Sequence, residues 1–334
     1  MSTSEPLPTT LESNQDELYK KICEDYEDLI ETLPKGKGWW VEHLYKHNGF
    51  WLAPIMVKNR LLLHTYFKSQ PSDLFLASFM KSGTTWLKAL MFSTINRHRY
   101  TISDHHLLRL GPQSTFPLME LEFDPTTDLT HLPAPRLFNT HLPLTLLPTS
   151  MTSCKFVYIC RDPKDVLISK WYFTSKTRSK DLAPLSLDEV FELFCQGISE
   201  CGPIWDHVLQ YWRASLDSPD KVLFLKYEDL KKQPEVELRK LAAFMGKPFT
   251  VEEEEKGVVE DIVKLCSFES LSNLEVNKKG VNDFKVVEVE NHLFFRKGEI
   301  GDWKNYLSEE MKERIDRITD EKLKGSGLIL GSKV

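Results

Sequence analysis

The segment that most constrains this chain is residues 79–86, with the sequence F-M-K-S-G-T-T-W. It follows an apolar run, residues 73–79, whose pattern is that of a buried strand. After it, apolar side chains recur at helical spacing from Leu87 to Ile95. A helix that starts directly after such a turn presents unpaired backbone N–H groups and the positive end of its dipole. The segment therefore predicts a strand–loop–helix unit that binds an anion.

Side chains of the same segment suit a phosphate-bearing ligand. Lys81 supplies a positive charge. The hydroxyls of Thr84 and Thr85 supply donors, and Trp86 offers an aromatic face on which a purine can stack. The segment differs from the phosphate loop of ATP and GTP enzymes, because there the lysine follows the last glycine, whereas Lys81 precedes Gly83. A tight turn with a surface lysine is the alternative interpretation of this segment alone.

Four strand-like runs along the chain each end just before a residue that can bind an anion or move a proton. The runs are residues 73–79, 136–139, 155–160 and 222–225. The residues that follow them are Lys81, His141, Arg161 and Tyr227. Alternation of strands and helices predicts a single α/β domain with a mostly parallel central sheet flanked by helices and a nucleotide-kinase-like phosphate-binding unit. Ligands of such sheets lie beyond the carboxyl ends of the strands, so we expect these four residues to share a site.

The composition of the chain limits the classes of binding partner and the cellular compartment that we expect. The formal net charge of −6 argues against broad binding of nucleic acid or membrane surfaces, although a small anionic ligand responds to the local field. The first residues lack the features of a secretory or transit signal, and no apolar stretch approaches membrane-spanning length. The six cysteines include no C-x-x-C pair, which is typical of reduced, buried thiols. We therefore expect a cytoplasmic protein.

Two further regions bear on domain organisation and on the ligand. We expect residues 1–16 to form a flexible tail and residues 17–334 to form one domain. An aromatic cluster at residues 39–51 fits either a core or a pocket for an apolar ligand. Residues 100–136 have weak periodicity, which predicts a long irregular loop of the kind that often binds ligands.

Several blocks in order resemble the cytosolic sulfotransferase family, and the G-K-G-W-W at residues 36–40 is similar to its plant members. The strong blocks are K-S-G-T-T-W at 81–86, N-T-H-L-P at 139–143, Y-I-C-R-D-P-K-D-V-L-I-S at 158–169 and R-K-G-E-I-G-D-W-K-N at 296–305. Weaker support comes from K-Y-E-D-L at 226–230 and C-S-F-E-S-L at 266–271. Together these blocks span most of the chain.

The resemblance implies transfer of a sulfuryl group from 3′-phosphoadenosine 5′-phosphosulfate (PAPS) to an acceptor hydroxyl, with no metal or redox cofactor. It implies that His141 is the general base and that Lys81 stabilises the leaving group, with Ser169 as a third catalytic residue. Histidine suits the first role because its pKa lies near neutrality.

The same resemblance implies a set of PAPS-binding residues. Ser82, Gly83, Thr84 and Thr85 would hold the 5′-phosphate together with Lys81. Arg161 and Ser169 would bind the 3′-phosphate, and a loop of Arg296, Lys297 and Gly298 would close over it. Arginine suits phosphate because its planar donors reach two oxygens. Trp86 and Phe268 would enclose the adenine, and Tyr227 would donate to the cofactor; core packing is the alternative for these three aromatic residues.

The chain departs from the family pattern at three positions. Met80 stands where the loop usually has proline, and Cys266 stands where threonine often binds the adenine edge. Asn139 stands where many animal members carry a second lysine, so one positive charge is missing there. The family's short C-terminal dimer motif is not found before Arg296, which slightly favours a monomer.

The acceptor is left open by the sequence. A steroid, a flavonoid, a hydroxy-fatty acid or a desulfo-glucosinolate would each fit a small, largely apolar, hydroxylated partner. A nucleotide-dependent kinase is a competing hypothesis, although the glycine spacing and a magnesium-binding acidic motif are missing. A non-enzymatic binder of a hormone-like ligand that kept the fold is the third.

Overall fold

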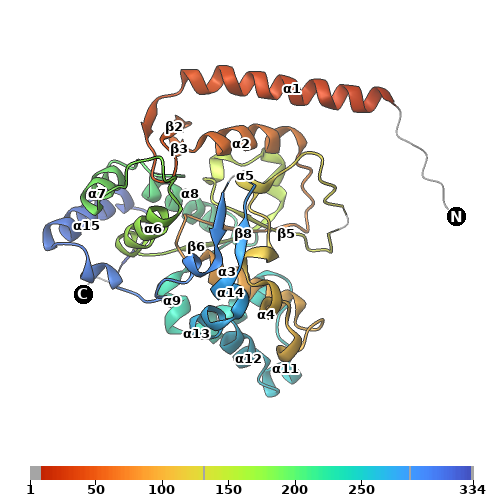
Figure 1. Cartoon of the computed structure of the whole chain (residues 1–334). Coiled ribbons are helices and arrows are strands. Elements are labelled where there is room, and N and C mark those ends of the chain that lie inside the picture. Colours follow the sequence, from red (N-terminus) through yellow and green to blue (C-terminus); the bar gives the residue numbers. More distant parts are fainter. Residues whose placement is uncertain (1–8, 131, 286, 332–334) are drawn as a thin grey trace.

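The computed structural model describes residues 9–130, 132–285 and 287–331 (Figure 1). Residues 1–8, the first half of the predicted tail, lie outside the described residues. Helix α1 (Thr9–Thr32) begins inside the remainder of that tail. The helix therefore starts earlier than the predicted boundary, because a helix once nucleated extends cheaply through adjoining polar residues.

A four-stranded parallel sheet forms the centre of the molecule, in the order β5-β4-β6-β7. Its strands are β4 (Leu74–Ser78), β5 (Leu137–Thr140), β6 (Lys155–Cys160) and β7 (Val222–Lys226). The order reverses at β4, since the chain places β5 on one side of β4 and then β6 on the other. A crevice at the carboxyl ends is expected at such a reversal. The predicted α/β class with a parallel central sheet is confirmed.

Both faces of the sheet are covered, which explains the continuous apolar runs of the strands. Along β4 and β6, alternate side chains enter two separate cores. Phe75 and Tyr158 lie in one core, while Leu76 and Ile159 lie in the other. Helices on the first face are α2 (Pro54–Tyr66), α6 (Pro163–Thr177), α7 (Leu187–Cys195), α8 (Ile204–Asp217) and α15 (Glu309–Leu323). Helices on the second are α3 (Thr84–Asn96), α9 (Tyr227–Lys232), α10 (Pro234–Phe244), α12 (Val258–Leu265) and α13 (Phe268–Asn273).

Local signals set where several of these helices begin. Asp162 caps α6 by accepting from the backbone N–H of Lys164, and Pro163 takes the first helical position. Thr250 forms a complete capping box with Glu253 at the start of α11 (Val251–Glu255). These caps fix the residues at which α6 and α11 begin.

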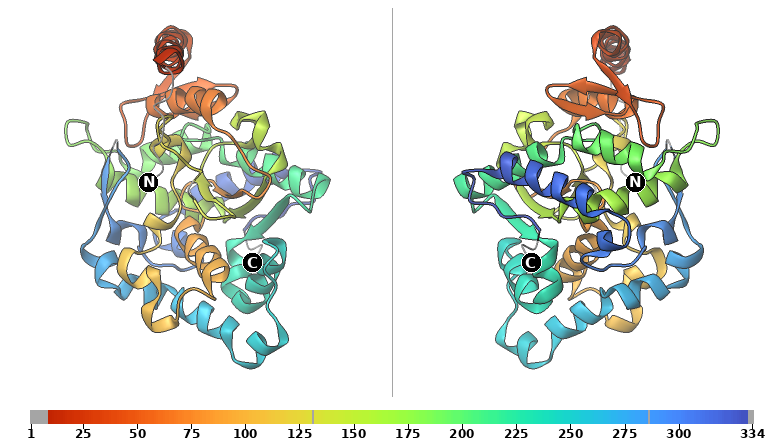
Figure 2. Two further views of the ribbon diagram at one scale, coloured as in Figure 1. Left: turned by 90° about the vertical axis from the view of Figure 1, so that its right-hand side faces the viewer. Right: turned by 90° about the vertical axis from the view of Figure 1, so that its left-hand side faces the viewer.

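An N-terminal layer lies over one edge of the molecule. It contains the antiparallel strands β1 (Lys35–Lys37), β2 (His43–His47) and β3 (Phe50–Leu52). Figure 2 shows α1 lying outermost, above this layer and α2. Within the aromatic cluster, Trp39 is fully buried in the core, whereas Trp40 is half-buried and lines a cavity. Both interpretations of the cluster therefore hold, each for different members.

The predicted irregular loop at residues 100–136 contains short helical turns. They are η1 (Ile102–Asp104), α4 (His106–Leu110), η2 (Gln113–Thr115) and α5 (Met119–Glu122). The prediction was wrong in this respect because helices of three to five residues are too short to show periodicity. The remaining elements are η3 (Leu144–Leu146), η4 (Thr149–Ser153), α14 (Glu275–Lys279), β8 (Val281–Asp283), β9 (Glu288–Glu290), η5 (Asn291–Phe294) and η6 (Asp302–Asn305).

The six cysteines are all free thiols, as predicted. Four of them are buried, whereas Cys23 and Cys195 are partly exposed. No helix of the described residues is long and apolar enough to cross a membrane.

Candidate active site

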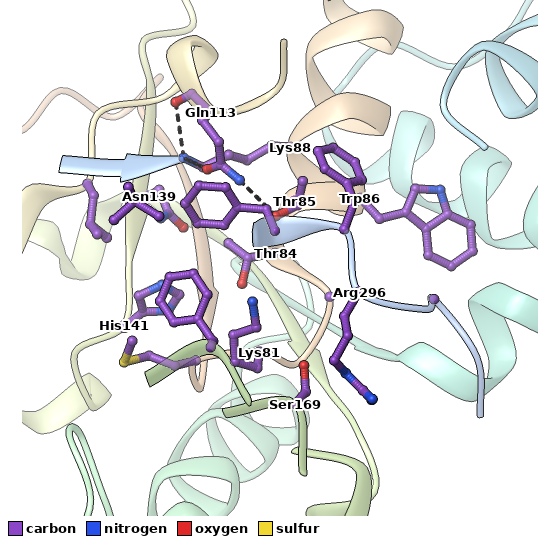
Figure 3. Close-up of a pocket in the computed structure, with 18 of the residues that line it drawn as sticks. Lys81, Thr84, Thr85, Trp86, Lys88, Gln113, Asn139, His141, Ser169 and Arg296 are labelled. Atoms are coloured by element: carbon purple, nitrogen blue, oxygen red, sulfur yellow. Dashed lines mark hydrogen bonds between the residues drawn. The ribbon is translucent and has the colours of Figure 1, made fainter. Parts of the chain in front are cut away.

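One cavity at the carboxyl ends of the strands gathers nearly all the residues that the sequence singles out (Figure 3). The predicted site residues that line it are Lys81, Gly83, Thr84, Thr85, Trp86, His141, Arg161, Ser169, Tyr227, Phe268, Arg296, Lys297 and Gly298. Ser82 lies beside the cavity rather than on its wall, with its hydroxyl buried and without a hydrogen-bond partner among the described residues. The expectation that the strand ends share one site is met in the geometry.

The loop between β4 and α3 has a backbone shaped to hold an anion. Lys81 and Gly83 both adopt positive φ values, 70° and 118°, and Gly83 is the N-cap of α3. A Cβ atom at Gly83 would lie 2.8 Å from the Tyr227 ring, so only glycine fits there. The Thr84 hydroxyl bonds the Ser78 hydroxyl at 2.7 Å. The loop therefore leaves the N–H groups of α3 and the unpartnered Ser82 hydroxyl for a ligand.

The ammonium group of Lys81 lies close to an aromatic ring and to other cationic side chains. Its Nζ lies 4.0 Å from the centroid of the Phe173 ring. Burial, together with the positive charges of Arg296 and Arg161, lowers the pKa of Lys81 to about 7. Because cations surround it, an arriving anion would raise that pKa again.

His141 is held so that one ring nitrogen is free to act as a base. Its Nδ1 lies 2.8 Å from the carbonyl oxygen of Ser78, so Nδ1 carries the proton and the lone pair of Nε2 is available. Its backbone N–H donates to Glu120 Oε1 at 2.6 Å, and the Thr140 hydroxyl donates to Glu120 Oε2 at 2.9 Å. Burial, with Lys88 and other cations nearby, lowers the pKa of His141 to about 3, so the ring is neutral at pH 7.

The opposite wall of the cavity is rich in cations. Arg161 lies over the Tyr227 ring at 4.4 Å, lies 3.4 Å from Asp165, and has a buried Nε without a partner among the described residues. Arg296 pairs with Asp302, and its Nε is also buried and unpartnered within the described part of the chain. Two arginines with orphaned donors facing one cavity form a cradle suited to phosphate.

The C-terminal loop packs closely on the aromatic part of the site. Gly298 has a φ of 67°, and a Cβ there would lie 2.4 Å from the Phe268 ring. Lys297 donates to Asp302 Oδ1 at 2.6 Å, and this bond raises the pKa of Lys297. Trp86 lies edge-on to Tyr227, with ring centroids 5.7 Å apart. The predicted aromatic residues and the predicted loop are therefore neighbours.

Several cavity residues were missed by sequence reasoning. Lys88, Gln113 and Glu120 are polar and buried, and the first two line the cavity. Lys88 carries a signal in hindsight, since it interrupts the apolar pattern of the helix from Leu87 to Met91. The apolar lining includes Trp40, Met56, Leu118, Leu121, Phe173, Phe284, Val287, Val289 and Phe294. Of these, Trp40 belongs to the predicted aromatic cluster, and Leu118 and Leu121 belong to the predicted 100–136 loop, whereas the others had no such signal.

Metal-ligating groups are also absent from the described residues, where no three His, Cys, Asp or Glu side chains are placed to hold a metal ion. The expectation of a metal-free reaction stays a prediction.

These features define a class: an α/β protein in which a glycine-containing strand–loop–helix unit, a cationic wall and a neutral histidine line one cavity. The family model described as the sulfotransferase domain matches residues 71–327. The chain belongs to the sulfotransferase family, and it is therefore an enzyme of the transferase class. The predicted family resemblance is confirmed.

Curated relatives cover almost the whole chain. It is 45% identical to cytosolic sulfotransferase 12 of Arabidopsis thaliana over 99% of this chain and 100% of the relative. It is 45% identical to flavonol 3-sulfotransferase of Flaveria bidentis over 91% of this chain and 99% of the relative. The plant character predicted from the N-terminal residues therefore agrees with these relatives.

Solved structures share the fold. An Arabidopsis thaliana protein described as a candidate steroid sulphotransferase is 37% identical, with a TM-score of 0.73 over 99% of this chain and 100% of that one. A mouse sulfotransferase complexed with PAP is 27% identical, with a TM-score of 0.66 over 85% of this chain and 95% of that one.

Proposed function

We propose that this sulfotransferase takes its sulfuryl group from PAPS and transfers it to a hydroxyl of a small, largely apolar acceptor. The observation that carries the proposal is the single cavity in which a histidine base faces an anion cradle with unpartnered donors. A relative was solved with PAP (3′,5′-phosphoadenosine), the nucleotide that remains after PAPS has given up its sulfuryl group. That complex supports PAPS as the donor. PAPS, when bound, supplies the sulfuryl group and a good leaving phosphate.

The cationic wall would hold the donor by its two phosphate ends. Ser82, Gly83, Thr84 and Thr85 would bind the 5′-phosphate through the start of α3. The buried orphan donor of Arg161 and the hydroxyl of Ser169 would bind the 3′-phosphate, with the 296–298 loop over it. Trp86, Phe268 and Tyr227 are close enough to one another to enclose an adenine ring.

Lys81 and His141 would divide the chemical work. The Nε2 lone pair of His141 takes the proton of the acceptor hydroxyl as that oxygen attacks. Lys81 donates to the oxygen that bridges phosphate and sulfur as negative charge grows there. Burial, and after it nearby positive charges, lower the pKa of His141 in the ligand-free protein. The negative charge of a bound donor would offset those charges and strengthen His141 as a base.

The acceptor would occupy the apolar part of the cavity, beyond His141. Its walls come from the N-terminal layer, α5 and the hairpin of β8 and β9. A flavonol sulfotransferase and a candidate steroid sulphotransferase among the similar proteins support a flat, hydroxylated, largely apolar acceptor. A steroid, a flavonoid, a hydroxy-fatty acid and a desulfo-glucosinolate stay open.

Two further parts of the proposal concern the cellular location and the oligomeric state of the protein. A cytoplasmic location is supported by relatives that are named cytosolic. A monomer is proposed only from the missing dimer motif. No observation favours the non-enzymatic binder, and membership of the sulfotransferase family counts against a kinase.

The test is transfer of radiolabelled sulfate from PAPS to a panel of hydroxylated acceptors from the four classes, with products separated by chromatography. Label on one acceptor class is expected. PAP binding without transfer to any acceptor would support the binder, and absence of both binding and transfer would contradict the proposal.

A further inference from the structure

The most unusual side chain in the acceptor half of the cavity is Lys88, on the second turn of α3. It is only 1% exposed, yet it lines the cavity. No carboxylate lies within 4 Å of its ammonium among the described residues. Its hydrogen bonds go to neutral oxygens: one of ordinary length, 3.1 Å to Phe116 O, and two long ones, 3.5 Å to both Gln113 O and Gln113 Oε1. Burying an ammonium group without an anionic partner costs free energy of folding, so the presence of Lys88 at this position needs an explanation.

The nearest acidic residues are already engaged by other donors. Glu120 accepts from the backbone of His141 and from the Thr140 hydroxyl. Glu122 accepts from the backbone N–H of Leu118. Both attract Lys88 from a distance, but burial still lowers its pKa to about 8. The ammonium therefore lacks a close counter-ion from the part of the chain that the structure describes.

One amide, Gln113, lies beside Lys88, and a second, Asn139, lines the same cavity. Gln113 donates from Nε2 to the Thr85 hydroxyl at 2.8 Å. Asn139 Oδ1 is buried and has no hydrogen-bond partner within the described residues. Figure 3 shows Lys88, Gln113 and Asn139 together on one side of the cavity, away from Ser169 and Arg296. This polar group therefore lies apart from Ser169 and Arg296 in Figure 3, and Gln113 joins it to the proposed 5′-phosphate site through Thr85.

We propose that Lys88, with Gln113 beside it, binds a carboxylate on the acceptor, so that the preferred acceptors are hydroxylated organic acids. The inference rests on the proposed function and narrows its acceptor class. The acceptor's hydroxyl would face His141 Nε2, while its carboxylate supplies the counter-ion that Lys88 lacks. Specificity would follow because removing the carboxylate leaves a buried charge unpaired.

A second consequence concerns the base. The charge of Lys88 is one of the causes that lower the pKa of His141. A carboxylate bound to Lys88 would cancel that influence and strengthen His141 as a proton acceptor. An acid would therefore improve both its own binding and the step in which its hydroxyl loses the proton.

The test compares matched acceptors that differ only in the carboxylate. We suggest ω-hydroxydodecanoic acid and 4-hydroxyphenylpropanoic acid, each beside its methyl ester, with PAPS as donor and kcat/KM as the readout. The wild-type protein should prefer at least one acid over its ester. Lys88→Met should lower kcat/KM for that acid by about 10- to 100-fold, the range for a lost hydrogen bond to a charged group. It should not lower kcat/KM for the ester, because the charge that is removed is one of those that lower the pKa of His141. Lys88→Arg should keep the preference.

A matched control is Lys155→Met, because Lys155 also donates to a main-chain carbonyl, Phe244 O at 2.8 Å, but lies outside the cavity lining. It should change neither acid nor ester turnover. If Lys88→Met does not fold, Lys88→Gln keeps a polar end group without the charge and should give the same loss for the acid.

Two outcomes would overturn the inference. Equal losses for acid and ester in a folded Lys88 variant would assign Lys88 to holding the 113–116 turn. Efficient sulfation of neutral acceptors, with no preference for any acid, would also overturn the inference, although the proposed function would stand. Failure of the proposed function is distinct, because then neither PAP binding nor transfer to any acceptor would be seen.

Discussion

The donor half and the acceptor half of the cavity are built in different ways. Most residues of the proposed donor half follow the ends of β4, β6 and β7 or begin α3, α9 and α13, and several of them carry charge. Ser169 lies farther along α6, and residues 296–298 belong to a loop. Acceptor residues come from the N-terminal layer, the short helix α5 and the β8–β9 hairpin, and most of them are apolar. Regular elements thus position the fixed chemistry, whereas short irregular ones shape the variable pocket. The two halves should therefore respond to mutation separately, with His141 and Lys81 at their junction.

The largest effect is expected at that junction. His141→Ala should lower kcat by about 10²- to 10⁴-fold, because the variant has lost its general base. PAP affinity, measured by calorimetry, should be nearly unchanged, because the phosphate cradle is intact. His43→Ala, at a half-exposed site on β2, is the control. Loss of PAP affinity equal to the loss of rate would place His141 in the donor half instead.

The second-largest effect is expected in the phosphate cradle, on the affinity for PAP. Arg161→Ala should weaken PAP binding by about 2–5 kcal/mol, the range for truncating a buried partner of a charge. Its control is Arg109→Ala, since Arg109 is exposed and pairs with Asp104. Calorimetry is the measurement, and unchanged PAP affinity would remove Arg161 from the site.

The backbone of the donor half can be tested at a glycine. Gly298→Ala adds a Cβ at positive φ that would meet the Phe268 ring, so PAP binding should weaken by about 1–3 kcal/mol. Gly246→Ala has a similar φ, 71°, but meets nothing within 4 Å. The control should cost stability and leave PAP affinity intact. Equal PAP affinities in the two variants would contradict a closed loop over the cofactor.

A substitution in the acceptor half should weaken the binding of the acceptor and not that of PAP. Phe284→Ala removes an apolar wall of the cavity and should raise the acceptor KM by about 10-fold or more, since burying a phenylalanine side chain is worth roughly 1.5–3 kcal/mol. The affinity for PAP should stay the same. Steady-state kinetics with the acceptor found in the panel provides the measurement, and a parallel loss of PAP affinity would break the separation of the halves.

The smallest effect is a change in bound protons. Lys81 has a pKa of about 7 in the ligand-free protein, below its ordinary value of 10.5, so it is largely neutral at pH 8. Bound phosphate favours the charged form and raises this pKa, so PAP binding at pH 8 should take up a proton. Calorimetry in buffers of different ionisation enthalpy measures that uptake, and Lys81→Met should abolish it. Proton release on binding would contradict the electrostatics of the site.

The same comparison explains what could be predicted from the sequence. The donor half was readable because a strand, a glycine turn and a helix N-terminus are local patterns, as at residues 79–86. The cap at Asp162 is local in the same sense. The N-terminal sheet was missed, because β1 and β3 have three residues each and gain their register only from β2. Lys88 was missed because its meaning depends on Gln113, 25 residues away along the chain.

The most direct test of the account is a crystal structure of the protein with PAP. The account predicts adenine between Trp86 and Phe268, the 5′-phosphate at the start of α3, and the 3′-phosphate on Arg161 and Ser169. His141 Nε2 should face the open end of the cavity. PAP bound elsewhere, or bound with its 3′-phosphate away from Arg161, would contradict the assignment of the donor half.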